Sequence, residues 1–163
     1  MSNLLTDDVK KALKPEPLST TLVITVGNAL RGDDGVGPYI AESVKKPVKG
    51  IKILDVADRP ENGIDPAVET KPKKTVVIDA ARFGGKPGEA KILPENLIPD
   101  TTLSTHSFPL KIITRMLESE TGSQVFFLGI EPKNLGFGEG LSVEVKKTAD
   151  EIISILKGVK THA

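Results

Sequence analysis

The chain has 163 residues, enough for one domain with a single hydrophobic core, and its 38% apolar and 27% charged residues are typical of a globular protein. Its 22 basic and 22 acidic residues cancel, which argues against nucleic acid or an anionic membrane surface as a partner. The sequence contains no cysteine, so disulfides, thiolate metal sites and a cysteine nucleophile are excluded.

The first residues are polar and are followed by two prolines. Residues 1–14 lack the apolar core of a signal peptide, and no later run reaches the roughly 20 apolar residues of a membrane-spanning helix. We therefore expect a cytoplasmic protein without membrane insertion. Pro15 and Pro17 interrupt any helix begun over residues 7–13. We expect a short, flexible appendage over residues 1–19, a domain over 20–158 and a tail over 159–163.

Strands and helices are predicted to alternate along the domain. Runs rich in Val, Ile and Thr predict strands over residues 20–26, 51–56, 75–80, 90–93 and 124–130. Apolar stripes at helical spacing predict helices starting at Pro38, after Ser107 and over 142–156. Because parallel neighbours need crossover helices, we expect a three-layer α/β/α fold around a twisted, mostly parallel sheet of about five strands. Ligands bind such sheets beyond the carboxyl ends of the strands.

Several acidic residues are predicted at this carboxyl edge of the sheet. Asp33 and Asp34 stand in the glycine-rich loop after the first strand, Asp55 lies near the end of the second, and Asp79 ends the third. One of the adjacent pair could cap the helix that starts near Pro38, and Asp79 could simply close its strand by hydrogen bonding. Alternatively, a metal ion could relieve the repulsion between adjacent carboxylates.

His106 directly precedes a predicted helix, and the other histidine of the chain is His162 in the polar tail. A cap or an ordinary polar role would explain a histidine at this position. However, two carboxylates and one imidazole from three separate loops would form an open, oxygen-rich site. Such a site suits a divalent first-row metal such as nickel.

Nucleotide-binding proteins and the familiar hydrolases fit these residues less well. The glycine-rich loop lacks the G-x-G-x-x-G pattern of dinucleotide binding and the lysine of a P-loop. Ser104 or Ser107 near His106 could act in a serine hydrolase, but there is no G-x-S-x-G elbow and sequence neighbours rarely share triad geometry. Paired Asp-Thr-Gly motifs of the pepsin kind are absent too. A protease with this sequence would be of an unfamiliar type.

Five segments together resemble the nickel-iron hydrogenase maturation endopeptidases. They are Val26-Gly27-Asn28-Ala29-Leu30-Arg31-Gly32-Asp33-Asp34-Gly35-Val36-Gly37; Asp55 with Arg59-Pro60-Glu61-Asn62; Val77-Ile78-Asp79-Ala80; Ser104-Thr105-His106-Ser107-Phe108-Pro109-Leu110; and Phe127-Leu128-Gly129-Ile130-Glu131-Pro132. The resemblance covers residues 20–156. The first segment is highly specific, and the order and spacing of all five make coincidence improbable.

The resemblance implies a fold, an activity and a set of ligands. Proteins of this family have a five-stranded sheet between helices and remove a C-terminal extension from the precursor of a hydrogenase large subunit after nickel insertion. The nickel arrives with the substrate and is bound by the protease. Carried over by position, the ligands are Asp34, Asp79 and His106, and we expect them to be the catalytic residues of an aspartic-type endopeptidase. No tightly bound organic cofactor is expected.

Two features refine this expectation. The glycine pair that follows the second-strand aspartate in the family is Val56-Ala57 here, which affects the shape of the cleft wall. The Pro-Glu-Asn loop resembles the group that serves membrane-bound, hydrogen-evolving hydrogenases, which suggests a client of that type. A non-catalytic nickel sensor or assembly chaperone with the same site is the alternative function.

Overall fold

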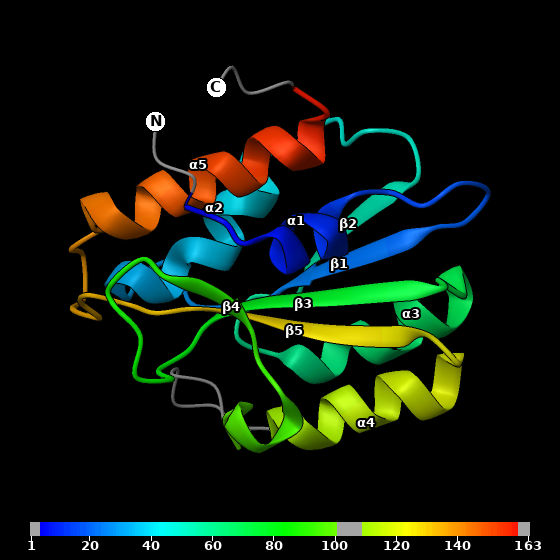
Figure 1. Ribbon diagram of the computed structural model, residues 1–163. Coiled ribbons are helices and arrows are strands. Elements are labelled where there is room, and N and C mark those ends of the chain that lie inside the picture. Colours follow the sequence, from blue (N-terminus) through cyan, green and yellow to red (C-terminus); the bar gives the residue numbers. More distant parts are fainter. Residues whose placement is uncertain (1–3, 101–108, 160–163) are drawn as a thin grey trace.

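The computed structural model of the chain describes residues 4–100 and 109–159, and it shows three layers around one sheet (Figure 1). The strands are β1 (Thr21–Thr25), β2 (Ile51–Asp55), β3 (Lys74–Ala80), β4 (Ala90–Ile92) and β5 (Gln124–Ile130). The helices are α1 (Asp7–Leu13), α2 (Val36–Ser43), α3 (Ile64–Thr70), α4 (Leu110–Thr121) and α5 (Val143–Lys157). Short 3₁₀ turns occupy η1 (Gly32–Gly35), η2 (Pro60–Gly63) and η3 (Glu95–Leu97). The predicted fold class is confirmed.

The sheet has the strand order β2-β1-β3-β5-β4, and β4 is its single antiparallel strand. Helices α1, α2 and α5 cover one face, and α3 and α4 cover the other (Figure 1). Strands β1 and β3 are buried along their whole length, as expected for central parallel strands. No helix among the described residues is long and apolar enough to cross a membrane.

The strand order changes direction at β1, because the chain goes from β1 to β2 on one side and returns to β3 on the other. The segments that follow β1 and β3 therefore lead toward opposite edges of the sheet, to β2 and to β4. In open α/β sheets, the crevice in which ligands bind lies outside the carboxyl ends of the strands at such a switch point, which here is between β1 and β3. The loop with Asp33 and Asp34 follows β1, and Asp79 lies in β3. The topology thus places both parts of the predicted site at the switch point.

The predicted helix boundaries are close to those observed. The last helix begins after Ser142, whose Oγ accepts a hydrogen bond from the Val145 N–H, and it ends at Gly158 in the left-handed region. Helix α2 begins at Val36, so Pro38 occupies its third position and not the predicted first. Since the N–H groups of the first turn have no partner within a helix, proline is tolerated there as well.

The N-terminal segment does not behave as a loose appendage. Residues 7–13 form α1, and Leu5, Val9 and Leu13 are buried in the core on the α5 side of the sheet. Lys74, at the start of β3, donates hydrogen bonds from Nζ to the carbonyl oxygens of Lys11 (3.2 Å) and Lys14 (2.8 Å). The expectation of flexibility is therefore wrong for this helix, because a buried lysine distant in sequence binds its C-terminal end.

Replacing Lys74 with methionine should release α1. The substitution keeps the apolar stem but removes the two hydrogen bonds, each worth about 1 kcal/mol when net contributions are counted. We expect the amides of α1 to exchange faster and the free energy of unfolding to fall by about 1–3 kcal/mol. Hydrogen exchange and urea denaturation would measure both effects. The exposed neighbour Lys73, changed to methionine, is the control and should alter neither.

Candidate functional site

The loop between β1 and α2 folds back against the end of β1. Gly27 has a φ of +148°, and a Cβ at this position would lie 2.0 Å from the carbonyl oxygen of Asp34. Similarly, a Cβ on Gly37 would lie 2.5 Å from the carbonyl oxygen of Val26. Only glycine permits this close approach of backbone to backbone. The two glycines therefore determine where η1 and its acidic residues lie.

The two adjacent aspartates of η1 serve different roles. Asp33 accepts four hydrogen bonds, from the N–H groups of Lys133 (2.8 Å), Asn134 (3.0 Å) and Ser142 (2.7 Å) and from Ser142 Oγ (2.9 Å). It thereby fastens the 133–142 loop and the start of α5 to η1. Neither aspartate caps α2, so that alternative is wrong, and the structural role of Asp33 depends on residues about 100 positions away.

Asp34 and Asp79 are buried carboxylates with unsatisfied oxygens. Asp34 is 1% exposed and Asp79 is fully buried. Asp34 Oδ2 accepts a hydrogen bond from the Asn28 N–H (3.0 Å), whereas in the described part of the chain Asp34 Oδ1 and both oxygens of Asp79 have no hydrogen-bond partner. Buried polar groups are nearly always satisfied in native proteins. Three unsatisfied carboxylate oxygens at the switch point therefore indicate a site for an electropositive group.

Burial raises the pKa of both carboxyl groups. The pKa of Asp34 rises to about 6, mainly through desolvation, although the Asn28 N–H and the positive charge of Arg31 act in the opposite direction. Desolvation, with the negative charge of Asp34 added, raises the pKa of Asp79 well above its ordinary value. The Ala80 N–H offsets this only in part and lies outside hydrogen-bonding geometry with either oxygen. Such perturbed carboxyl groups in a crevice are typical of functional sites.

His106 lies outside the described residues, so its place in the site stays a prediction. The described chain on either side of its segment is joined, because the Leu110 N–H donates to the Asp100 carbonyl oxygen (2.8 Å). Helix α4 runs antiparallel to β5, so its first residue, Leu110, lies at the carboxyl edge of the sheet (Figure 1). Within residues 4–100 and 109–159, no group of three His, Asp or Glu side chains could hold a metal ion. A third ligand would have to come from elsewhere.

The other predicted rim acid, Asp55, is already hydrogen-bonded. Its Oδ1 accepts from Thr25 Oγ1 (2.9 Å) and from the Ala57 N–H (3.3 Å), so it ties β2 to β1. Ala57 has a φ of +51°, a conformation that favours glycine, and its carbonyl oxygen accepts from the Gly27 N–H (2.7 Å). Ala57, which stands in place of a glycine of the family, thus adopts a conformation that glycine prefers, and this costs conformational energy.

Two residues near the site were missed in the sequence. Arg31 contributes positive charge at Asp34, and its guanidinium lies 5.3 Å from the centroid of the Phe137 ring. Glu131 is buried and accepts hydrogen bonds from the N–H groups of Phe83 (2.9 Å) and Gly85 (3.0 Å), so it supports the loop after β3. The sequence did offer a signal for Glu131, because it directly follows the β5 strand and so lies at the carboxyl edge of the sheet, where site residues gather.

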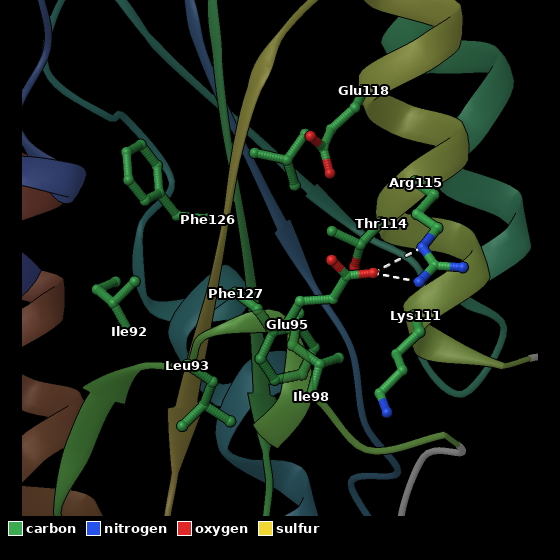
Figure 2. A pocket seen from close by; sticks show the side chains of 11 residues that line it. Ile92, Leu93, Glu95, Ile98, Lys111, Thr114, Arg115, Glu118, Phe126 and Phe127 are labelled. Atoms are coloured by element: carbon green, nitrogen blue, oxygen red, sulfur yellow. Dashed lines mark hydrogen bonds and ion pairs between the residues drawn. The ribbon is translucent and has the colours of Figure 1, made fainter.

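A separate cavity of about 290 Å³ lies between α4 and strands β4 and β5 (Figure 2). Apolar side chains including Leu93, Ile98 and Phe127 line it, and Arg115 Nε donates to Glu95 Oε1 (2.7 Å) at its rim. Neither Asp34 nor Asp79 lines this cavity. It is therefore distinct from the switch-point crevice.

Asp79→Asn should stabilise the protein at neutral pH. The raised pKa means that the folded state holds its proton at pH values where the unfolded chain has lost it, so wild-type stability falls as pH rises above the ordinary aspartate range. Asparagine carries no charge and avoids this loss. We expect the variant to gain about 1–3 kcal/mol relative to wild type at pH 7.5, and much less at pH 4.5, in urea denaturation.

Asp33→Asn is the matched comparison and should have the opposite sign. Asparagine keeps one acceptor oxygen, which can replace Oδ2, but its NH2 group would then face the Ser142 N–H that now donates to Oδ1, and the charge that strengthens all four hydrogen bonds is lost. We expect a loss of about 1–3 kcal/mol at pH 7.5 in the same denaturation experiment. Equal effects of the two substitutions would contradict the division of roles between these acids.

Comparisons with known proteins agree with this architecture. The sequence profile described as hydrogenase maturation protease matches residues 38–158. The hydrogenase 3 maturation protease of Escherichia coli K12 is 33% identical over 141 residues, which cover 85% of this chain and 90% of that protein. A putative hydrogenase maturation protease of Methanocaldococcus jannaschii is 30% identical over 165 residues, with 96% and 94% covered.

Solved structures show the same relationship. The crystal structure of a [NiFe] hydrogenase maturation protease from Thermococcus kodakarensis superposes with a TM-score of 0.76 at 31% identity, covering 93% of this chain and 97% of that one. The crystal structure of the hydrogenase 3 maturation protease gives a TM-score of 0.75 at 31% identity, with 88% and 93% covered. The chain therefore belongs to the hydrogenase maturation protease family.

Proposed function

We propose that the protein is an endopeptidase that removes the C-terminal extension of a nickel-iron hydrogenase large-subunit precursor after nickel insertion. Family membership supports peptide hydrolysis, and the E. coli and T. kodakarensis relatives are named as hydrogenase maturation proteases. The observation that carries the proposal is the pair of buried carboxylates at the switch point, Asp34 and Asp79, because three of their four oxygens have no hydrogen-bond partner in the described part of the chain. This pair suits a cation that arrives with the substrate.

In this proposal, Asp34, Asp79 and His106 bind the nickel of the precursor, and the ion is part of the substrate. Two carboxylate ligands and one imidazole leave further coordination positions for the precursor's own ligands. Binding would relieve the cost of burying the three unsatisfied oxygens of Asp34 and Asp79, so a nickel-loaded precursor would bind more tightly than an empty one. The site would thereby recognise completed metal insertion.

Coordination also places the scissile peptide in the crevice. Holding a peptide bond next to a catalytic group lowers the entropic part of the barrier, and a bound metal can polarise the carbonyl or activate water. We assign the role of general base to Asp79 first. It is fixed within β3, and neither of its oxygens has a hydrogen-bond partner among the described residues, so one of them can accept a proton. As the water oxygen adds to the carbonyl carbon, Asp79 takes a proton from the water; the C–N bond then breaks, and the same proton passes from Asp79 to the leaving peptide nitrogen. A carboxylate general base would make the enzyme an aspartic-type endopeptidase. We place the enzyme in the cytoplasm together with its client, the hydrogenase precursor.

The test is a processing assay with purified nickel-loaded precursor, followed as shortening of the large subunit on a gel. Asp34→Asn, Asp79→Asn and His106→Ala should each lower the rate of cleavage by about 100-fold or more, since each removes a group that acts on the reacting centre. The exposed Asp65 changed to asparagine and the other histidine, His162, changed to alanine are the controls. Full processing by all three site variants would exclude the proposed ligands.

A non-catalytic nickel sensor or assembly chaperone is the second function that the same carboxylate pair would support. The assay separates the two, because a chaperone would bind nickel-loaded precursor without releasing a C-terminal peptide. Wild-type protein should release the peptide from nickel-loaded precursor and leave nickel-free precursor intact. Stable binding without release would favour the chaperone.

A further inference from the structure

Strand β2 is an open edge of the sheet. It pairs with β1 on one side, and no described strand lies on its other side. The opposite edge strand, β4, has three residues, its Ala90 is buried, and α1 packs against it. Strand β2 is the longer and more accessible of the two edges. It has five residues, and the side chains of residues 52–55 are half-exposed or exposed. An open edge offers backbone groups to another strand.

The ladder shows which backbone groups of β2 point outward. The Thr21 N–H donates to the Gly50 carbonyl oxygen, and the Val56 N–H donates to the Thr25 carbonyl oxygen. In a parallel ladder, alternate residues direct both backbone groups to the same neighbour. Even-numbered residues of β2 therefore bond to β1, and Ile51, Ile53 and Asp55 face outward. The Ile51 N–H donates to Val48, so Ile53 and Asp55 keep outward N–H groups without a backbone partner among the described residues.

A groove of about 510 Å³ runs along the same edge, between β2 and the C-terminal half of α2. Val44, Ile51 and Ile53 contribute apolar side chains to it. Charged residues of both signs surround these side chains, namely Glu42, Lys45, Lys52 and Asp55. An added strand would thus form backbone hydrogen bonds with β2 and place alternate side chains in the groove, which is how extended peptides bind sheet edges.

We propose that the C-terminal extension of the precursor docks as an added strand on β2. The inference rests on the proposed function and names the surface that holds the segment to be removed. Three observations favour this occupant: the free backbone groups suit an extended peptide, the groove beside them accepts its side chains, and the edge leads to the switch point. Asp55, the last residue of β2, is hydrogen-bonded to Thr25 of β1, so the edge ends beside the crevice.

The geometry sets how far the docked segment lies from the scissile bond. Neighbouring strands are about 4.8 Å apart, so a strand added to β2 would lie about 14 Å from β3 and Asp79. An extended chain covers about 3.3 Å per residue. About four or five residues therefore connect the cleavage point to the docked strand. Shortening the extension to fewer residues than this should raise the KM for cleavage.

Ile53→Pro tests the docking directly. Proline removes the outward N–H and is tolerated on an edge strand, where the ladder to β1 does not use that group. We expect the KM for nickel-loaded precursor to rise about tenfold, with kcat unchanged, because the site at Asp79 is two strands away.

Ile92→Pro is the matched control. The Leu93 N–H and the Glu89 carbonyl oxygen bond to β5, so Ile92 also directs its N–H outward, but from the other edge. The KM of the Ile92→Pro variant should match that of the wild-type protein.

Amide exchange provides a second measurement that does not depend on folding of the proline variant. With wild-type protein and a nickel-loaded precursor whose scissile peptide bond is replaced by a non-hydrolysable one, the amides of Ile53 and Asp55 should gain protection. Lack of protection, or an unchanged KM for a folded Ile53→Pro protein that still cleaves, would overturn the docking and leave the proposed function intact. Pairing of β2 with a second copy, seen as a dimer without precursor, would also overturn it. Absence of cleavage by wild type would instead refute the proposed function.

Discussion

The close approach of the glycine-rich loop to the end of β1 is the constraint on which the site depends. Gly27 and Gly37 let backbone pack on backbone at distances that a Cβ would prevent. The loop therefore cannot swing away into solvent, and Asp34 is held in the crevice at the end of the strand next to β3. Without this packing, Asp34 would be an ordinary exposed carboxylate. Its burial, its raised pKa and its interaction with Asp79 all follow from it.

The site is built at the expense of stability, and neighbouring residues offset part of this cost. Asp33 is as buried as Asp34, yet four donors satisfy it and it joins η1 to the start of α5. Within residues 4–100 and 109–159, Asp34 and Asp79 keep oxygens without hydrogen-bond partners beside that rigid framework. A framework of this kind is what a binding site needs, because ligands fixed in advance lose little entropy when the substrate arrives. The same arrangement explains why a neutral residue at position 79 should stabilise a protein that it inactivates.

Much of the fold was predictable, because periodicity and turn residues are local signals. The four longer strands, the helices α2, α4 and α5 and the position of Asp79 at a strand end all follow from such patterns, whereas α3 was not predicted as more than a short helix within a loop. The separate roles of Asp33 and Asp34 were not predictable, since they depend on Lys133, Asn134 and Ser142 far along the chain. Docking of α1 was missed for the same reason, because it depends on Lys74. The role of His106 stays a prediction.

The attachment of α1 has a consequence for the order of folding during synthesis. The helix has seven residues, and helices of this length are unstable alone in water. Its binding partner Lys74 is translated 60 residues after Lys14, and most of the core cluster that contains Val9 is translated later still. On the ribosome, the first segment must therefore stay unfolded until β3 has emerged. A chaperone that binds the N-terminal segment, or a bulky N-terminal fusion, would affect folding during that interval, before the central strands of the sheet have paired.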